Sequence, residues 1–120
     1  MARILVIDDQ EPIRALLRIA LEGDGHEVLE ASNGRLGLEL YREKSADLII
    51  TDIVMPEMDG LKMMVDLTRT FLNVKVIAMS GRLEGEGLLN MAKQLGARQT
   101  FQKPLDMEKL LRAVRYDLAH

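Results

Sequence analysis

Residues 48–56 read Leu48-Ile49-Ile50-Thr51-Asp52-Ile53-Val54-Met55-Pro56. A short run of apolar and β-branched residues that ends in turn-forming residues is typical of a buried strand in a parallel sheet. Asp52 therefore stands at the carboxyl end of a strand, where open α/β sheets bind their ligands. A second apolar run, residues 4–7, leads in the same way into Asp8 and Asp9. Together these segments predict three carboxylates at one edge of a sheet.

The rest of the chain alternates short apolar runs with helical periodicity. Strands are expected at residues 4–7, 26–31, 48–52, 74–79 and 98–102, each followed by apolar residues at helical spacing. Five strand–helix units in series predict an α/β fold, a doubly wound (βα)5 three-layer sandwich with a parallel sheet between two helical layers. The flavodoxin-like strand order 2-1-3-4-5 is expected because it encloses the apolar first, third and fourth strands.

Helical spacing also predicts which side of each helix faces the core, by the i, i+3, i+4 rule. The expected core residues are Ile13, Leu16, Leu17, Ala20 and Leu21; Leu36, Leu40 and Tyr41; Leu61, Met64, Val65 and Thr68; Leu88, Met91, Ala92 and Leu95; and Met107, Leu110, Leu111, Val114 and Leu118. Asn33 is expected to open the second helix, and Asp59 and Asp106 to cap the third and fifth. Gly96 is expected to close the fourth.

Length and composition limit the class of protein. A chain of 120 residues, 48% of them hydrophobic, suits one domain spanning residues 1–120 with a substantial core. The net charge of -3 argues against a nucleic-acid surface, which is normally basic. The chain contains no cysteine, which excludes disulfides and thiolate metal sites. No signal peptide or membrane-spanning stretch is visible, so a cytoplasmic protein without membrane contact is expected.

Polar side chains end four of the five expected strands. In chain order they are Asp8 with Asp9, then Asp52, Ser80 and Lys103. Because the expected strand order places the first and third strands side by side, the three carboxylates should meet in one crevice. Like charges so close together need a cation to offset their repulsion. This predicts a Mg²⁺ site, since Mg²⁺ prefers oxygen ligands.

The same residue types suit phosphoryl transfer, which depends on positioning and on electrostatic stabilisation of the phosphoryl oxygens. A carboxylate is an adequate nucleophile toward phosphorus and yields an acyl phosphate. An ammonium group supplies a point charge to one phosphoryl oxygen, and a hydroxyl can hydrogen-bond another. Asp52, Lys103 and Ser80 are therefore the candidate catalytic residues. Each alone could be a turn residue or a solvated charge, and Asp8 and Asp9 could cap a helix; their joint placement at strand ends favours a site.

Three stretches of the chain resemble the receiver domain of two-component response regulators. They are Ile4-Leu5-Val6-Ile7-Asp8-Asp9, the long segment from Asp47 to Gly60, and Phe101-Gln102-Lys103-Pro104. With their spacing, they extend the resemblance over essentially the whole chain. The resemblance implies that Asp52 accepts a phosphoryl group. It also implies that Asp9 and Asp52 bind Mg²⁺ directly together with the backbone carbonyl of Val54, and that Asp8 acts through water.

The resemblance further implies a signalling switch and not an enzyme with a separate substrate. The domain would nevertheless catalyse its own phosphoryl transfer and dephosphorylation. Ser80 would move toward the phosphate, and Lys103, followed by a cis peptide bond at Pro104, would pair with the phosphoryl oxygens. The phosphoryl donor would be a sensor histidine kinase or a phosphotransfer protein.

The resemblance also implies that a downstream protein target, or an output domain outside this sequence, recognises the phosphorylated state. The surface read would be the face formed by residues 88–95, 98–102 and 107–118. Direct nucleic-acid binding by this domain is not expected, and a phosphorylation-dependent dimer stays open. Whether the chain is a stand-alone receiver or a piece of a larger regulator also stays open.

One position departs from the family pattern. The family usually carries Tyr or Phe three residues before its lysine, whereas this chain has Thr100 there and Phe101 one residue later. In a strand, a shift of one residue moves a side chain to the opposite face. Phe101 is therefore expected in the core, and signalling is expected to rely on Ser80 and the loop after it. Glycines between residues 81 and 87 predict that this loop is mobile.

Two other classes of protein fit less well. A phosphohydrolase of the haloacid dehalogenase type also uses an aspartate nucleophile and Mg²⁺, but it needs a second acid two residues later. Here Gln10 follows Asp8, and Val54 follows Asp52, at that spacing. A flavodoxin-like electron carrier would need a Ser/Thr/Gly-rich loop after the first strand, where this chain has residues 8–11, two aspartates, a glutamine and a glutamate. Phosphomonoester turnover would support the first class, and flavin absorbance the second.

Overall fold

The structure is a computed structural model that describes residues 1–55, 60–71, 73–81 and 85–120. Its strands are β1 (Arg3–Ile7), β2 (Glu27–Ala31), β3 (Leu48–Asp52), β4 (Val76–Ser80) and β5 (Gln99–Gln102). Its helices are α1 (Glu11–Gly23), α2 (Gly34–Glu43), α3 (Gly60–Thr70), α4 (Gly85–Gln94) and α5 (Met107–Ala119). Strands and helices alternate throughout, as the apolar pattern predicts.

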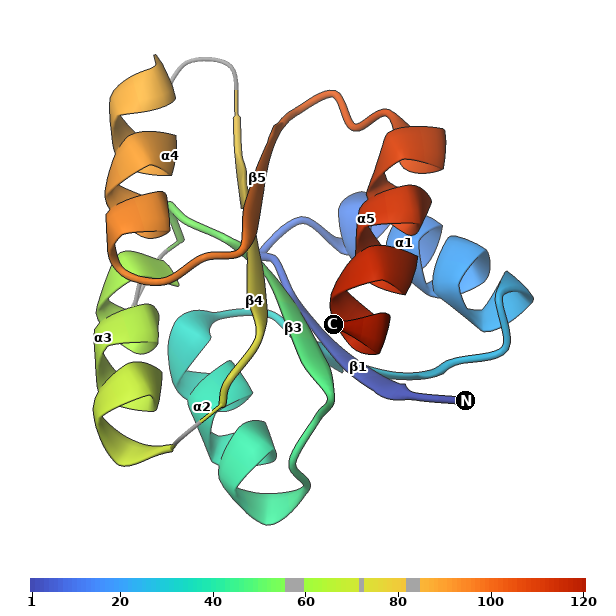
Figure 1. The fold of residues 1–120 in the computed structure, drawn as a ribbon, viewed down its shortest axis with the longest axis horizontal. Helices are drawn as coiled ribbons and strands as arrows, with labels where there is room; N and C mark the ends of the chain where they lie inside the picture. The colour runs from blue at the N-terminus through green and yellow to red at the C-terminus, as the bar shows by residue number, and fades with distance from the viewer. Residues whose placement is uncertain (56–59, 72, 82–84) are drawn as a thin grey trace.

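The five strands form one parallel sheet in the order β2-β1-β3-β4-β5. Helices α1 and α5 cover one face, and α2, α3 and α4 cover the other (Figure 1). The predicted flavodoxin-like doubly wound fold is therefore confirmed. The polar strand β5 lies at an edge of the sheet, as expected, because a strand with one neighbour is less enclosed than the central strands.

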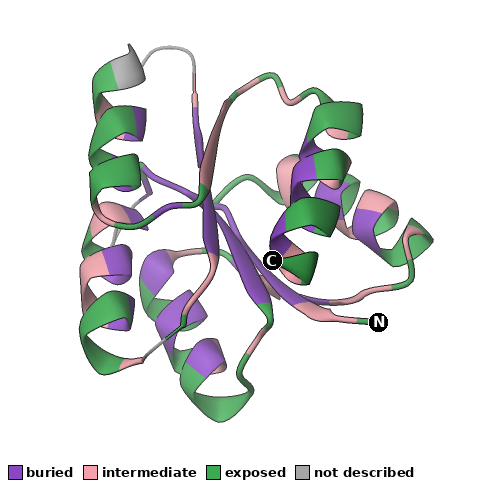
Figure 2. Ribbon diagram, viewed as in Figure 1, coloured by how far each residue is buried: buried purple, intermediate pink, exposed green. Residues whose placement is uncertain are grey.

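The core lies on both faces of the sheet because successive side chains of a strand point to opposite sides. In β1, Leu5 and Ile7 pack toward α2, α3 and α4, whereas Ile4 and Val6 pack toward α1 and α5. Every residue of β3 and β4 is buried, as Figure 2 shows for the centre of the molecule. Each fully buried Leu or Ile side chain stabilises the fold by about 1.5–3 kcal/mol.

Helix ends follow the predicted capping at the described positions. The side chain of Asn33 accepts a hydrogen bond from the Leu36 amide at 2.8 Å, and Asp106 accepts one from the Lys109 amide at 3.2 Å. Gly96 follows α4 with a φ of 113°, in the left-handed region that favours glycine. The predicted cap at Asp59 lies outside the described residues. Of the segment predicted to be mobile, residues 82–84 also lie outside them, and residues 85–87 begin α4.

The predicted core faces of the helices were partly wrong. Leu16 is 44% exposed and Met91 is 50% exposed, and Leu36 and Thr68 also lie on exposed surface. Other residues of the same helices pack against the sheet in their place, namely Leu38, Met63, Leu67 and Leu89. The i, i+3, i+4 rule gives the spacing of the apolar residues along one side of a helix. Packing against neighbouring elements decides which side of the helix faces the core. Among the described residues, no helix is long and apolar enough to cross a membrane.

Candidate functional site

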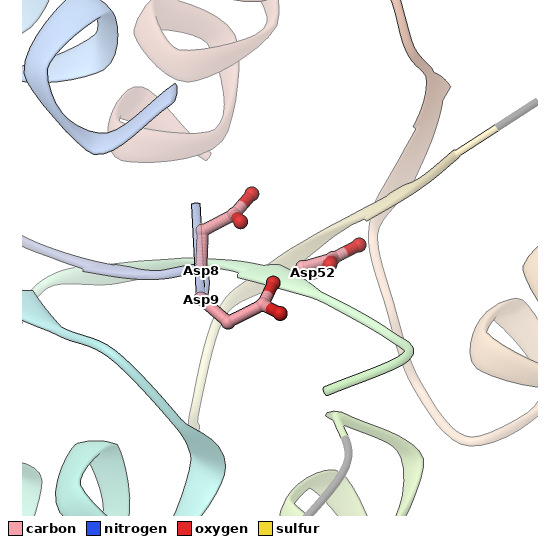
Figure 3. Close-up of side chains that lie close together, drawn as sticks. All are labelled: Asp8, Asp9 and Asp52. Carbon is pink, nitrogen blue, oxygen red and sulfur yellow. The ribbon is translucent and has the colours of Figure 1, made fainter. Parts of the chain in front are cut away.

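Three aspartates meet where β1 and β3 end. The two strands are neighbours, with Ile7 paired to Thr51, so the residues that follow each pairing lie side by side. The carboxylates of Asp8, Asp9 and Asp52 extend to the same side from these strand ends (Figure 3). One carboxylate oxygen from each lies within 4.8 Å of the others. The structure thus brings together the three acids that the sequence places at strand ends.

The burial of the three carboxylates differs. Asp8 is fully buried, Asp52 is 4% exposed, and Asp9 lies on the exposed side of the cluster. Burial, and next the negative charge of Asp8, raise the pKa of Asp52 to about 6. The ammonium of Lys103 and the backbone N–H of Ile53 act in the opposite direction on this pKa. Asp52 is therefore a carboxylate that its surroundings do not fully stabilise.

Asp8 and Asp52 differ in how many of their carboxylate oxygens accept a hydrogen bond among the described residues. Both carboxylate oxygens of Asp8 accept a hydrogen bond at 2.8 Å, Oδ1 from the backbone N–H of Gln10 and Oδ2 from Lys103 Nζ. Asp52 Oδ1 accepts one from the backbone N–H of Ile53 at 3.0 Å. Asp52 Oδ2 accepts none within the part of the chain that the structure describes. This oxygen is the one available for a bond to a ligand.

Lys103 reaches the acids from the end of β5. Its backbone N–H donates to the carbonyl of Ser80 at 2.8 Å, which ties it to the end of β4. The peptide bond between Lys103 and Pro104 is cis, as the family resemblance implies. The ammonium forms an ion pair with Asp8 at 2.8 Å and lies 3.6 Å from Asp52 Oδ2. Three carboxylates and one ammonium leave the site negatively charged.

Ser80 and Val54 lie beside the cluster but do not join it in this structure. Ser80 is fully buried at the end of β4, and its hydroxyl donates to the carbonyl of Gly81 at 3.2 Å. Val54 lies two residues after Asp52, with 47% of its surface exposed. The predicted roles of the Ser80 hydroxyl and of the Val54 carbonyl therefore stay predictions.

Gly60 is a site residue that the functional reasoning from sequence missed. Its N–H donates to the carbonyl of Ile53 at 2.7 Å, which holds the start of α3 against the end of β3. A Cβ at Gly60 would overlap the carbonyl oxygen of Asp52 and would lie 2.9 Å from the Cα of Ile53. Only a residue without a side chain can approach the backbone of Asp52 so closely. The signal in the sequence was the glycine at the start of a helix that follows the acidic strand.

The aromatic side chain near Lys103 is partly buried and packs against the core, on the side predicted for it. Phe101 pairs with Met79 of β4 and packs with it against the residues of α1 and α5. Thr100 pairs with Ala78, which packs on the opposite side toward α2, α3 and α4. The one-residue shift therefore places the aromatic ring on the other face from Thr100.

The donor set suits a hard divalent cation. All three side chains offer carboxylate oxygens, and three acids within 4.8 Å repel one another unless a positive charge lies between them. The lone ammonium of Lys103 is already paired with Asp8. The residues present therefore fit Mg²⁺, with Asp9 and Asp52 as the acids that carry oxygens without a hydrogen bond in the described part of the chain.

Comparison with known proteins agrees with this geometry. The family model of the response regulator receiver domain matches residues 4–115. Protein PilH of Pseudomonas aeruginosa is 36% identical over 121 residues, covering 99% of each chain. Sporulation initiation phosphotransferase F of Bacillus subtilis is 32% identical over 113 residues, covering 94% of this chain and 90% of its own. A crystal structure of a receiver domain protein from Clostridium thermocellum matches with a TM-score of 0.89 and 33% identity, covering 99% of this chain and 95% of its own.

The match spans nearly the whole chain and includes each strand end that carries a candidate residue. The chain therefore belongs to the receiver domains of two-component response regulators. This family favours neither of the two alternatives considered from sequence, the dehalogenase-type phosphohydrolase and the flavin-binding electron carrier.

Proposed function

We propose that this receiver domain is a phosphoacceptor switch in which Asp52 carries the phosphoryl group. A carboxylate oxygen of Asp52 attacks phosphorus, an O–P bond forms, and the P–N bond of a phosphohistidine donor breaks with its electron pair passing to the imidazole. Water later attacks the same phosphorus, which releases phosphate and restores the carboxylate. The observation that carries this proposal is that Asp52 Oδ2, which accepts no hydrogen bond among the described residues, lies beside two acids and 3.6 Å from the ammonium of Lys103.

Asp9 and Asp52 would hold Mg²⁺, together with the backbone carbonyl of Val54, and Asp8 would act through water. When bound, the ion would offset the negative charge of the acids and of the phosphoryl oxygens. Support comes from the all-oxygen donor set and from the net negative charge of the cluster.

Lys103 and Ser80 would bind the phosphoryl oxygens. The ammonium of Lys103 already lies 3.6 Å from Asp52 Oδ2, so a small movement brings it to an oxygen bonded to that carboxylate. Within the described residues, the Ser80 hydroxyl donates to the adjacent Gly81 carbonyl, and rotation of one side-chain bond would redirect it. Phosphorylation would then favour one of two conformations through these new contacts.

The proposed partners are a sensor histidine kinase or a phosphotransfer protein as donor, and a protein target or output domain as reader, in the cytoplasm. The relative named as a sporulation phosphotransferase supports the donor class. The domain would catalyse its own phosphorylation and dephosphorylation without acting on a separate substrate. The reader would bind the face of α4, β5 and α5.

Labelling by acetyl phosphate tests this proposal. The wild-type protein with Mg²⁺ should gain one phosphoryl group by intact mass, and the label should be released by hydroxylamine, as an acyl phosphate is. Asp52→Asn should abolish the label. Asp66→Asn, the same chemical change on α3 away from the cluster, should keep it. Label retained by Asp52→Asn would place the acceptor elsewhere.

A further inference from the structure

Gln10 is an unusual residue for the start of a helix. It is the N-cap residue of α1, where Ser, Thr, Asp and Asn are preferred because their short side chains bond the first free amides. The Gln10 side chain makes no such capping bond among the described residues. Its Oε1 instead accepts a hydrogen bond at 3.1 Å from Lys103 Nζ, 93 residues away in the chain.

This contact closes a ring of three hydrogen bonds. The backbone N–H of Gln10 donates to Asp8 Oδ1 at 2.8 Å, Lys103 Nζ donates to Asp8 Oδ2 at 2.8 Å, and Lys103 Nζ donates to Gln10 Oε1 at 3.1 Å. The Lys103–Asp52 separation of 3.6 Å lies beyond hydrogen-bond distance. The ammonium is therefore held on the side of Asp8 and Gln10, next to Asp52 but not bonded to it.

We propose that Gln10 is a positioning residue that holds the Lys103 ammonium in its resting place, and that this hydrogen bond is exchanged for one to a phosphoryl oxygen when Asp52 is phosphorylated. The inference rests on the proposed function of Asp52. Beyond that function, the inference assigns to Gln10 a control over how readily the Lys103 ammonium moves to the phosphoryl group.

The difference between the two acceptors decides which bond is given up. Asp8 is charged and fully buried, so losing Lys103 would leave an unpaired charge away from water. Gln10 is neutral and exposed, and its amide oxygen can bond water instead. The bond to Gln10 is thus the weaker of the two and the one that breaks first.

Substitutions at Gln10 should change the rate of phosphorylation in opposite directions. Gln10→Ala removes the acceptor and should speed labelling by acetyl phosphate with Mg²⁺ about threefold to tenfold, the factor that one hydrogen bond supplies. Gln10→Glu offers a charged acceptor and should slow it. Gln94→Ala, an exposed glutamine at the end of α4, is the matched control and should leave the rate unchanged. An unchanged or slower rate in Gln10→Ala would overturn the inference.

A second measurement does not depend on phosphorylation. In protein labelled with ¹⁵N-lysine and free of Mg²⁺, NMR reports how fast the Lys103 ammonium exchanges protons with water; loss of the signal in Lys103→Arg assigns it. Gln10→Ala should speed this exchange severalfold, and Gln10→Glu should slow it. Unchanged exchange in both variants would overturn the inference. Should the wild type take no label from acetyl phosphate while the exchange responds as expected, the holding contact stands and the function proposed for Asp52 fails.

Discussion

The fold places the carboxylate of Asp52 where its ionised form is poorly stabilised. It lies almost fully out of water, next to the charge of Asp8, and its pKa is raised from 3.8 to about 6. The folded protein therefore binds a proton at this carboxyl more tightly than the unfolded chain does. At neutral pH the ionised Asp52 costs folding free energy, and Lys103 offsets only part of that cost because it is bonded to Asp8.

The variant Asp52→Asn should therefore be more stable than the wild type in Mg²⁺-free buffer at pH 7. Because the pKa of Asp52 is higher in the folded state, wild-type stability falls as pH rises from about 4 through 6, and the variant escapes this loss. A gain of about 1–3 kcal/mol is expected, since a tenfold change in proton affinity corresponds to about 1.4 kcal/mol. Urea unfolding at several pH values measures it. A gain that persisted unchanged below pH 4 would contradict this explanation.

At the scale of elements, the site depends on how closely α3 approaches the end of β3. Two helical glycines, Gly60 and Gly87, differ in how much space a side chain would have. Gly60 leaves no room for a side chain because the backbone of Asp52 and Ile53 lies directly against it. Gly87, in α4, has open space around the position of a Cβ, with nothing described within 4 Å.

The same substitution should therefore have opposite effects at the two glycines. Gly60→Ala should destabilise the protein by about 1–3 kcal/mol, since α3 or the end of β3 must shift to admit the methyl group. Gly87→Ala should stabilise it by about 0.5–1 kcal/mol, because alanine favours a helix over glycine. Chemical denaturation of both variants measures the difference. Equal effects would show that the start of α3 tolerates a side chain.

For the whole molecule, the proposed binding of an ion at the three acids would be linked to folding. The three acids come from two separate segments and meet only in the folded chain, so an ion that they hold stabilises the folded state alone. Their mutual repulsion at 4.8 Å or less is present without the ion and is relieved by it. If the three acids hold an ion, the stability of the entire domain would report on its occupancy.

Millimolar Mg²⁺ should raise the melting temperature of the wild-type protein. When the ion is at about 100 times its dissociation constant, the gain is about 2.7 kcal/mol. Asp9→Ala should greatly reduce the shift because it removes an exposed ligand without disturbing the buried core. Differential scanning calorimetry at matched ionic strength measures both. A wild-type shift no larger than that of Asp9→Ala would argue against a cation site at these residues.

The amino-acid sequence by itself determined the alternation of strands and helices, the strand order and the residues that end each strand. The alternation and the strand ends follow from local apolar periodicity, which each segment carries on its own. The strand order follows from comparing the strands, because the most apolar of them must be enclosed by neighbours. It also predicted that Phe101 lies on the face opposite Thr100, because side chains alternate along any strand.

The tertiary structure alone decided the rotation of the helices, which leaves Leu16 and Met91 exposed, and the contacts of Lys103. Its pairing with Asp8 and Gln10 in preference to Asp52 depends on atoms more than 90 residues apart meeting within about 3 Å. The raised pKa of Asp52 and the closeness of Gly60 depend in the same way on burial and packing. The apolar pattern of the sequence does not predict these distances between side chains, because they are set only when separate elements pack together.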